Sequence, residues 1–166
     1  MSLLLASILL SIVTTMFSVQ TEKSKIEKNG MSVEWYHKAD RVYFEVQAPT
    51  DGWVAIGFNN KDRLTGNNLI MGAVKDDKVE MTDGYIVGVG NHQVMEKIGG
   101  SNQLQDIEGR ESMGKTTVAF SLPVKAADQF HFDLDQGKTY FLLIAYSRAD
   151  DFEHHSTMRT SVSINL

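Results

Sequence analysis

The chain has 166 residues, a formal net charge of −5, and 42% hydrophobic and 9% aromatic residues. This length is enough for one domain with a sizeable core, and this composition excludes global disorder. Lysine and arginine are scattered along the chain, so the basic stripe that a nucleic-acid-binding surface needs is missing.

The N-terminal segment differs from the rest of the chain. Residues 1–20 contain no charged side chain, and residues 3–17 are almost entirely apolar or small. This pattern is typical of a secretory signal peptide, because an apolar run of about 15 residues is short for a membrane span. We expect a signal peptide over residues 1–20, a polar linker over 21–30 and one domain over 31–166. The mature protein would then be secreted or periplasmic without a stable membrane span, and a short membrane anchor is the alternative.

From residue 31 onward, short runs that favour β-strands alternate with turn signals. Val42, Phe44 and Val46 alternate with Tyr43 and Glu45, which is the pattern of a strand with one buried face. A continuous apolar run such as residues 53–58 is typical of a strand covered on both faces. The expected strands are residues 31–37, 41–48, 53–58, 69–74, 78–87, 103–112, 115–122, 138–147 and 157–166.

The segments between these runs carry turn chemistry. Asp76-Asp77 and Met113-Gly114 predict tight hairpins, the glycine-rich residues 88–100 predict a mobile excursion, and residues 126–136 predict a helical turn. About nine strands without a long amphipathic helix predict an all-β domain, either an antiparallel sandwich or a closed barrel. The chain has no cysteine, so such a domain would depend on its apolar core rather than on disulfides.

Motifs for catalysis are missing from the sequence, which has no P-loop, no GxSxG, no HExxH and no GxGxxG followed by a helix. We therefore expect a protein that is not an enzyme. Asp150, Asp151 and Glu153 form an acidic run that fits a solvated loop better than a calcium site or a hydrolase pair. His154 and His155 follow this run, and imidazole is the side chain most often recruited as a metal ligand.

Three segments, taken in order, resemble the DOMON domain family. They are residues 52–59 (GWVAIGFN), residues 66–74 (GNNLIMGAV) with the return over 78–85 (KVEMTDGY), and residues 155–165. The family pattern has a GW-x-x-(I/L)-G strand, an M-x-G-A-D stretch, a T/S-D hairpin return and a late His-x-x-x-Arg segment. The ordered match extends over roughly residues 31–166.

The resemblance implies an extracytoplasmic, immunoglobulin-like β-sandwich that binds a small ligand between its sheets. In the family's cytochrome members, including the haem domain of cellobiose dehydrogenase, this ligand is haem b. A methionine and a late histidine hold the iron, and two filled axial positions suit electron transfer. Other members are thought to bind sugars or to act as interaction modules.

Transferred residue by residue, the resemblance makes His155 the metal ligand, with His154 as a one-residue alternative. The methionine position falls on Leu64, and leucine cannot bind iron. Met71 would be the second ligand if its side chain faced the same pocket, whereas packing in the core is the favoured alternative. Arg159 would pair with a haem propionate or a sugar acid, or balance the acidic run. Equally, His155 would form a hydrogen bond with the acidic loop and bind no metal.

Three functions therefore stay open. The leading one is a secreted cytochrome b domain that binds haem b and passes electrons to a redox partner protein. The second is a non-haem module that binds a carbohydrate or another small ligand through a polar loop. The third is a structural or interaction domain without a ligand. The polar side chains offered by the loop are Asn59, Asn60, Arg63, Asn67 and Asn68.

Overall fold

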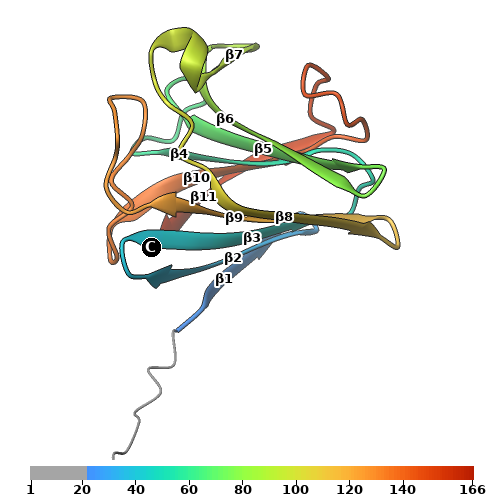
Figure 1. Cartoon of the computed structure of the whole chain (residues 1–166), viewed down its shortest axis with the longest axis horizontal. Helices are drawn as coiled ribbons and strands as arrows, with labels where there is room; N and C mark the ends of the chain where they lie inside the picture. The colour runs from blue at the N-terminus through green and yellow to red at the C-terminus, as the bar shows by residue number, and fades with distance from the viewer. Residues whose placement is uncertain (1–21) are drawn as a thin grey trace, which may run out of the picture.

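The computed structural model describes residues 22–166, so the predicted signal segment, residues 1–20, lies outside the described residues. Two antiparallel sheets stack face to face (Figure 1). One has the order β1–β2–β3–β9–β8 and the other the order β11–β10–β4–β5–β6–β7. The predicted antiparallel β-sandwich is confirmed, and the closed-barrel alternative is wrong. The strands are β1 (Ser24–Lys28), β2 (Met31–Lys38), β3 (Arg41–Ala48), β4 (Val54–Asn59), β5 (Asn68–Lys75), β6 (Lys78–Gly88), β7 (Asn91–Val94), β8 (Gln105–Ser112), β9 (Lys115–Pro123), β10 (Thr139–Tyr146) and β11 (Met158–Asn165).

The described chain has eleven strands, two more than the sequence predicted. β1 lies in the segment expected to be a linker and pairs with β2, so Ser24–Lys28 belongs to the five-stranded sheet. β7 and a 3-10 helix, η1 (Met95–Ile98), occupy the segment expected to be a mobile excursion. Both additional strands lie at sheet edges and carry few apolar residues, so hydrophobic alternation does not reveal them. Residues 126–136 form turns and bends rather than the predicted helical turn.

Two predicted hairpins are present, and their backbone angles explain them. Asp76 and Asp77 have φ angles of 50° and 59°, and Met113 and Gly114 have φ angles of 54° and 71°. Positive φ at both central residues is the requirement of the type I′ turn, whose twist matches that of paired strands. Aspartate and glycine tolerate this conformation better than most residues.

The main core lies between the two sheets and is built from alternate residues of their strands. Phe44 of β3 packs against Phe58 of β4 and Phe120 of β9, with ring centroids 5.3 Å and 5.5 Å apart. Phe58 and Phe120 are at most 2% exposed. The inner faces are therefore filled by packed aromatic and aliphatic side chains, as a two-layer fold requires.

A second apolar cluster covers the outer face of the six-stranded sheet. It takes the opposite alternation of the same strands, so Ala55, Met71 and Leu143 face outward while Ile56, Ile70 and Ile144 face the main core. This explains why β4 and β5 are buried on both faces, as the continuous apolar run 53–58 predicted. The outward-facing members are Trp53, Ala55, Leu69, Met71, Ala73, Ile86, Leu143 and Ala145, with Leu64 and Phe152 packed against them.

Candidate functional site

A cavity of about 330 Å³ lies over this outer apolar cluster. Its floor is formed by Ala55 of β4, Leu69 and Met71 of β5, and Leu143 and Ala145 of β10. This cavity lies on the outer face of the sheet, whereas the resemblance implied a ligand between the two sheets. The strand alternation that fills the inner faces leaves smaller outward residues, such as Ala55 and Ala145, under open space.

Two segments from opposite sides of the sheet form the walls. One wall is the loop between β10 and β11, which contributes residues 152–156, and the other is β7 with η1. β7 and β11 are the two edge strands of the six-stranded sheet. Figure 1 shows that the loop before β11 and the β7–η1 segment both rise from the face of this sheet that points away from the five-stranded sheet. The floor of the cavity lies between them.

The histidine-bearing wall is fixed to β4 through backbone hydrogen bonds. The Trp53 N–H donates to the carbonyl of Ala149 at 3.0 Å, and the Ser147 N–H donates to the carbonyl of Trp53 at 2.9 Å. A Cβ added at Gly52 would lie 2.5 Å from the backbone carbonyl carbon of Arg148. Only glycine allows the two backbones to approach this closely, so Gly52 sets the starting point of the wall.

The five histidines of the chain fall into two groups. His37 bonds to the carbonyl of Leu134 at 2.8 Å, His131 to two aspartates, and His154 to Oδ2 of Asp151 at 3.2 Å. Within residues 22–166, the rings of His92 and His155 have no hydrogen-bond partner, and both line the cavity. Two imidazoles that line the cavity, on the half-buried His92 and the exposed His155, are therefore not engaged by any side chain or backbone group of the described residues.

The four residues predicted to bind the cofactor all lie at this one cavity. His154, His155 and Arg159 line it from the loop and β11, and Met71 lines it from the floor. Met71 is 3% exposed and belongs to the outer apolar cluster, so it packs and faces the cavity at the same time. Leu64, at the position of the family's methionine, also lines the cavity. Their roles as ligands stay predictions.

The predicted contacts with the acidic run are made by a different residue. His154, rather than His155, bonds to Asp151, and the pKa of Asp151 is lowered by the backbone N–H of Glu153 and then by His154. In the described part of the chain, Arg159 forms no ion pair with that run. Residues 22–166 also contain no cluster of three or more histidine or acidic side chains placed to hold a metal ion.

Sequence reasoning missed three residues that line the cavity: His92, Lys97 and Trp53. His92 and Lys97 lie in the glycine-rich segment that was expected to be mobile. The sequence pattern did not indicate that His92 pairs with Ile86 of β6 in a short edge strand. Trp53 begins the apolar run that was expected to be buried, and it is 4% exposed. Its indole N–H has no hydrogen-bond partner among the residues that the structure describes. An unpaired buried donor costs about 1–3 kcal/mol, which an acceptor on a bound group would offset.

The charges around the cavity favour an anionic ligand. Lys97 and Arg159 lie at its rim with the imidazoles of His92, His154 and His155, whereas Glu153 is the one acidic side chain that lines it. An apolar floor beneath a cationic rim suits a ligand that has a large apolar surface and one or more carboxylates.

The polar loop before β5 is mostly engaged in holding its own shape. The Nδ2 of Asn59 donates to the carbonyl of Thr65 at 3.2 Å, and that of Asn67 donates to the carbonyl of Leu64 at 2.6 Å. Asn68 donates to Oδ1 of Asp83 at 2.8 Å. All three asparagines are at most 2% exposed. They are therefore not free to bind a sugar in the way the sequence suggested.

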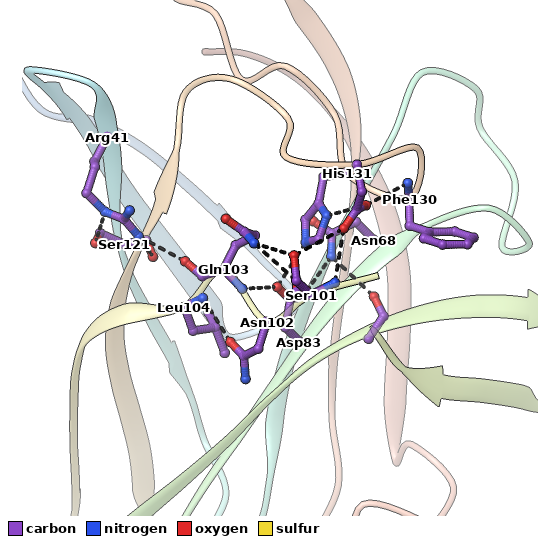
Figure 2. Close-up of polar contacts among 12 residues, drawn as sticks. Arg41, Asn68, Asp83, Ser101, Asn102, Gln103, Leu104, Ser121, Phe130 and His131 are labelled. Carbon is purple, nitrogen blue, oxygen red and sulfur yellow. Dashed lines mark hydrogen bonds and ion pairs between the residues drawn. The ribbon is translucent and has the colours of Figure 1, made fainter. Parts of the chain in front are cut away.

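A buried polar cluster lies around Asp83 of β6, whose register partner Ile70 faces the main core. Asp83 of β6 accepts hydrogen bonds from Asn68, from the backbone N–H of Gln103 at 2.9 Å and from His131 at 2.9 Å (Figure 2). Asp128 accepts from the other ring nitrogen of His131 at 2.8 Å. Burial lowers the pKa of His131, but the hydrogen bonds and charges of Asp83 and then Asp128 outweigh it and raise the pKa. The cluster joins four separate segments and does not line the cavity.

A family model described as DOMON domain matches residues 27–147, which is most of the chain. The chain belongs to the DOMON domain family. The resemblance inferred from the sequence motifs is thereby confirmed. In the described residues no helix is both long and apolar enough to cross a membrane.

Similar proteins are larger than this DOMON domain. The DOMON domain-containing protein FRRS1L of Mus musculus is 36% identical over 85 residues, which are 50% of this chain and 27% of that protein. The DBH-like monooxygenase protein 2 of Mus musculus is 28% identical over 127 residues, which are 76% of this chain and 20% of that protein. The chain therefore spans less than a third of the length of these curated relatives.

Two solved structures share the fold at low sequence identity. The cytochrome b domain of pyranose dehydrogenase from Coprinopsis cinerea superimposes with a TM-score of 0.62 at 10% identity, covering 86% of this chain and 80% of that one. The cytochrome domain of Myriococcum thermophilum cellobiose dehydrogenase gives 0.58 at 12% identity, covering 87% and 81%. The DOMON sandwich described above is therefore the fold of these cytochrome domains.

Proposed function

We propose that this DOMON domain binds haem b in the cavity on the outer face of its six-stranded sheet and serves as an electron-transfer module rather than an enzyme. The observation that carries the proposal is the combination of an apolar floor, two unengaged imidazoles and a cationic rim in one cavity. Haem has a flat apolar macrocycle, an iron that accepts imidazole nitrogen, and two propionates. Each part of the cavity thus has a counterpart on that ligand.

Different residues of the cavity would contact different parts of the haem. His155 would hold the iron through a ring nitrogen. Arg159 and Lys97 would hold the propionate carboxylates, one of which the guanidinium of Arg159 could bind through two hydrogen bonds. Ala55 and Leu143 present apolar surface that excludes water from the ring. Bound haem supplies reversible one-electron chemistry at iron.

The fold shared with two cytochrome domains supports this proposal over a carbohydrate-binding module. A sugar site needs several polar groups aimed at hydroxyls. Three of the asparagines that would supply them are buried and already bonded, Asn59 and Asn67 within their own loop and Asn68 to Asp83 of β6. The cavity floor, by contrast, is apolar across β4, β5 and β10.

We further propose that the domain works outside the cytoplasm with a protein redox partner. The uncharged, apolar residues 3–17 support export, because they have the character of a signal peptide. Expression of the full chain in a bacterium, followed by sequencing of the N-terminus of the periplasmic protein, tests this point. Recovery in the cytoplasm with residues 1–20 attached would contradict export.

A haem titration tests the proposal directly. Haemin added to the purified haem-free protein should produce a sharpened Soret band that saturates near one equivalent. His155→Ala should weaken binding about tenfold or more, because it removes an iron ligand. His154→Ala is the matched control, since His154 lines the same cavity but already bonds to Asp151. Lack of a saturable Soret change in the wild type would contradict haem binding.

A further inference from the structure

A second axial ligand for the proposed haem can be identified in this chain, an inference that rests on the proposed function. Leu64 stands at the family's methionine position and lines the cavity, but its side chain has no atom that binds iron. A six-coordinate iron would therefore need another residue. Among the described residues that line the cavity, the candidates with a suitable donor atom are Met71, His92 and His154.

Met71 is poorly placed to be that ligand. It lies in the middle of β5, paired with Ala55 on one side and Thr82 on the other, so its side chain belongs to the floor. Axial ligands of haem must approach from opposite faces of the ring. If His155 on one wall holds the iron, the second ligand would come from the opposite wall. The floor between the two walls would face the edge of the haem ring.

His92 lies on the wall opposite His155. It belongs to β7, one edge strand of the six-stranded sheet, whereas His155 immediately precedes β11, the other edge strand. Figure 1 shows that these two segments flank the same face of the sheet. His154 shares the wall of His155, so it is an alternative to His155 and not its partner across the cavity.

The segment that carries His92 is held in place by its neighbours. His92 pairs with Ile86 of β6, and the next residues form η1, in which Met95 is fully buried. The Gly100 N–H donates to the carbonyl of Met95 at 2.9 Å and closes this turn. The imidazole of His92 is half-buried and has no hydrogen-bond partner within residues 22–166, so its ring nitrogens are not committed elsewhere.

We propose that His92 and His155 together provide bis-imidazole ligation, in place of the methionine and histidine pair of the family. His92 would thereby fill the position that leucine at position 64 cannot fill. A second imidazole also has a functional consequence, since a thioether ligand raises the reduction potential of haem iron. This domain should therefore have a lower potential than a methionine-ligated variant of itself.

Electron paramagnetic resonance and absorbance spectra of the haem-loaded full chain test the assignment. The ferric wild type should be low-spin with the signature of two imidazoles and without the charge-transfer band of an iron–methionine bond. His92→Ala should convert most of the iron to the high-spin form while haem stays bound through His155. Met71→Leu and His154→Ala should leave the low-spin spectrum unchanged.

His92→Met provides a second, independent readout. This variant should keep the iron low-spin, acquire the iron–methionine band and show a raised reduction potential. The assignment is overturned if Met71→Leu, but not His92→Ala, abolishes the low-spin spectrum, or if the wild type is high-spin. These results would leave haem binding itself intact. Failure of the wild type to bind haem at all would instead overturn the proposed function and this assignment together.

Discussion

Nε2 of His131 lies 2.9 Å from Oδ2 of Asp83, and the two side chains are 5% and 0% exposed. Asp128 engages the other ring nitrogen at 2.8 Å, so two carboxylates hold one imidazole by both of its N–H groups. Because breaking a buried pair leaves an uncompensated charge, His131→Gln should lower the free energy of unfolding by about 3–5 kcal/mol near pH 5.5. Urea unfolding followed by circular dichroism measures this loss.

The contribution of His131 should depend on pH in a defined direction. Burial lowers its pKa, but Asp83 and Asp128 raise it above the usual 6.5, so the stabilisation is fully present below pH 6.5 and is lost as the pH rises through the folded-state pKa. Burial raises the pKa of Asp128, but its hydrogen bonds from His131 and two backbone N–H groups lower it below 3.8. The stabilisation that comes from ionised Asp128 is present above pH 3.8 and is lost in stronger acid.

The difference in stability between wild type and His131→Gln should therefore be largest between about pH 4 and 6.5 and shrink toward pH 9. His154→Gln is the control, because its pair with Asp151 has side chains that are 64% and 60% exposed. Its loss should leave the stability nearly unchanged at any pH, because exposed ion pairs contribute little. A His131→Gln difference that grows with rising pH would contradict this account of the cluster.

Two consecutive residues of β10 test which face of the sheet holds the core. Ile144 is fully buried between the sheets, whereas Leu143 is 8% exposed and borders the cavity. Ile144→Ala should destabilise the protein by about 2–5 kcal/mol, and Leu143→Ala by less than about 2 kcal/mol, because the cavity already leaves that side chain partly unpacked. Chemical denaturation compares the two. Equal losses would show that the outer cluster is as tightly packed as the inner core.

Gly52 tests how the histidine wall is positioned. A Cβ there would lie 2.5 Å from backbone atoms of Arg148, so Gly52→Ala must push the start of the wall away from β4. We expect a loss of about 1–3 kcal/mol in stability together with weaker haem binding. For Gly88→Ala, the added Cβ meets no atom of the described chain within 4 Å, so this control should change neither. Normal haem affinity in Gly52→Ala would mean that the wall does not depend on this contact.

The rim cations should act mainly through charge. Arg159→Gln should weaken haem binding about three- to tenfold at low salt, and added salt should reduce the difference, because exposed charge pairs are screened. Lys125→Gln is a suitable control, since Lys125 pairs with Asp133 and Asp135 away from the cavity. Titrations at low and high ionic strength measure both. A salt-independent effect of Arg159→Gln would indicate lost packing rather than lost charge.

Most of the fold follows from local patterns. The central strands β3, β4 and β10 were predicted to within one residue at each end, because their alternating or continuous apolar runs are strong. β1 was missed because its residues SKIEK contain a single apolar side chain, Ile26, and gain their stability from pairing with β2. Such edge strands depend on tertiary pairing that alternation does not encode.

The site was predictable only in part. The sequence motif identified the loop of His154 and His155 and also Arg159. The structure then pairs Arg159 of β11 with Ala145 of β10, on the outer face of the sheet. Alternation assigns Met71 to one face of β5 but does not say which face meets the other sheet, so the cavity on the outer face was not expected. His92 and the pair of His131 with Asp83 depend on contacts between residues far apart in the chain, which spacing along the sequence does not reveal.

The central claim is that the ligand binds over the outer face of the six-stranded sheet, and filling that space tests it most directly. Ala145 of β10 is 4% exposed and lines the cavity, whereas Ala119 of β9 faces outward from the five-stranded sheet, between Glu45 and Glu108. Haemin should be titrated into Ala145→Phe and Ala119→Phe after circular dichroism has shown that both are folded. We predict that Ala145→Phe loses the saturable Soret change and that Ala119→Phe binds as the wild type does. Unchanged binding by a folded Ala145→Phe would contradict the site.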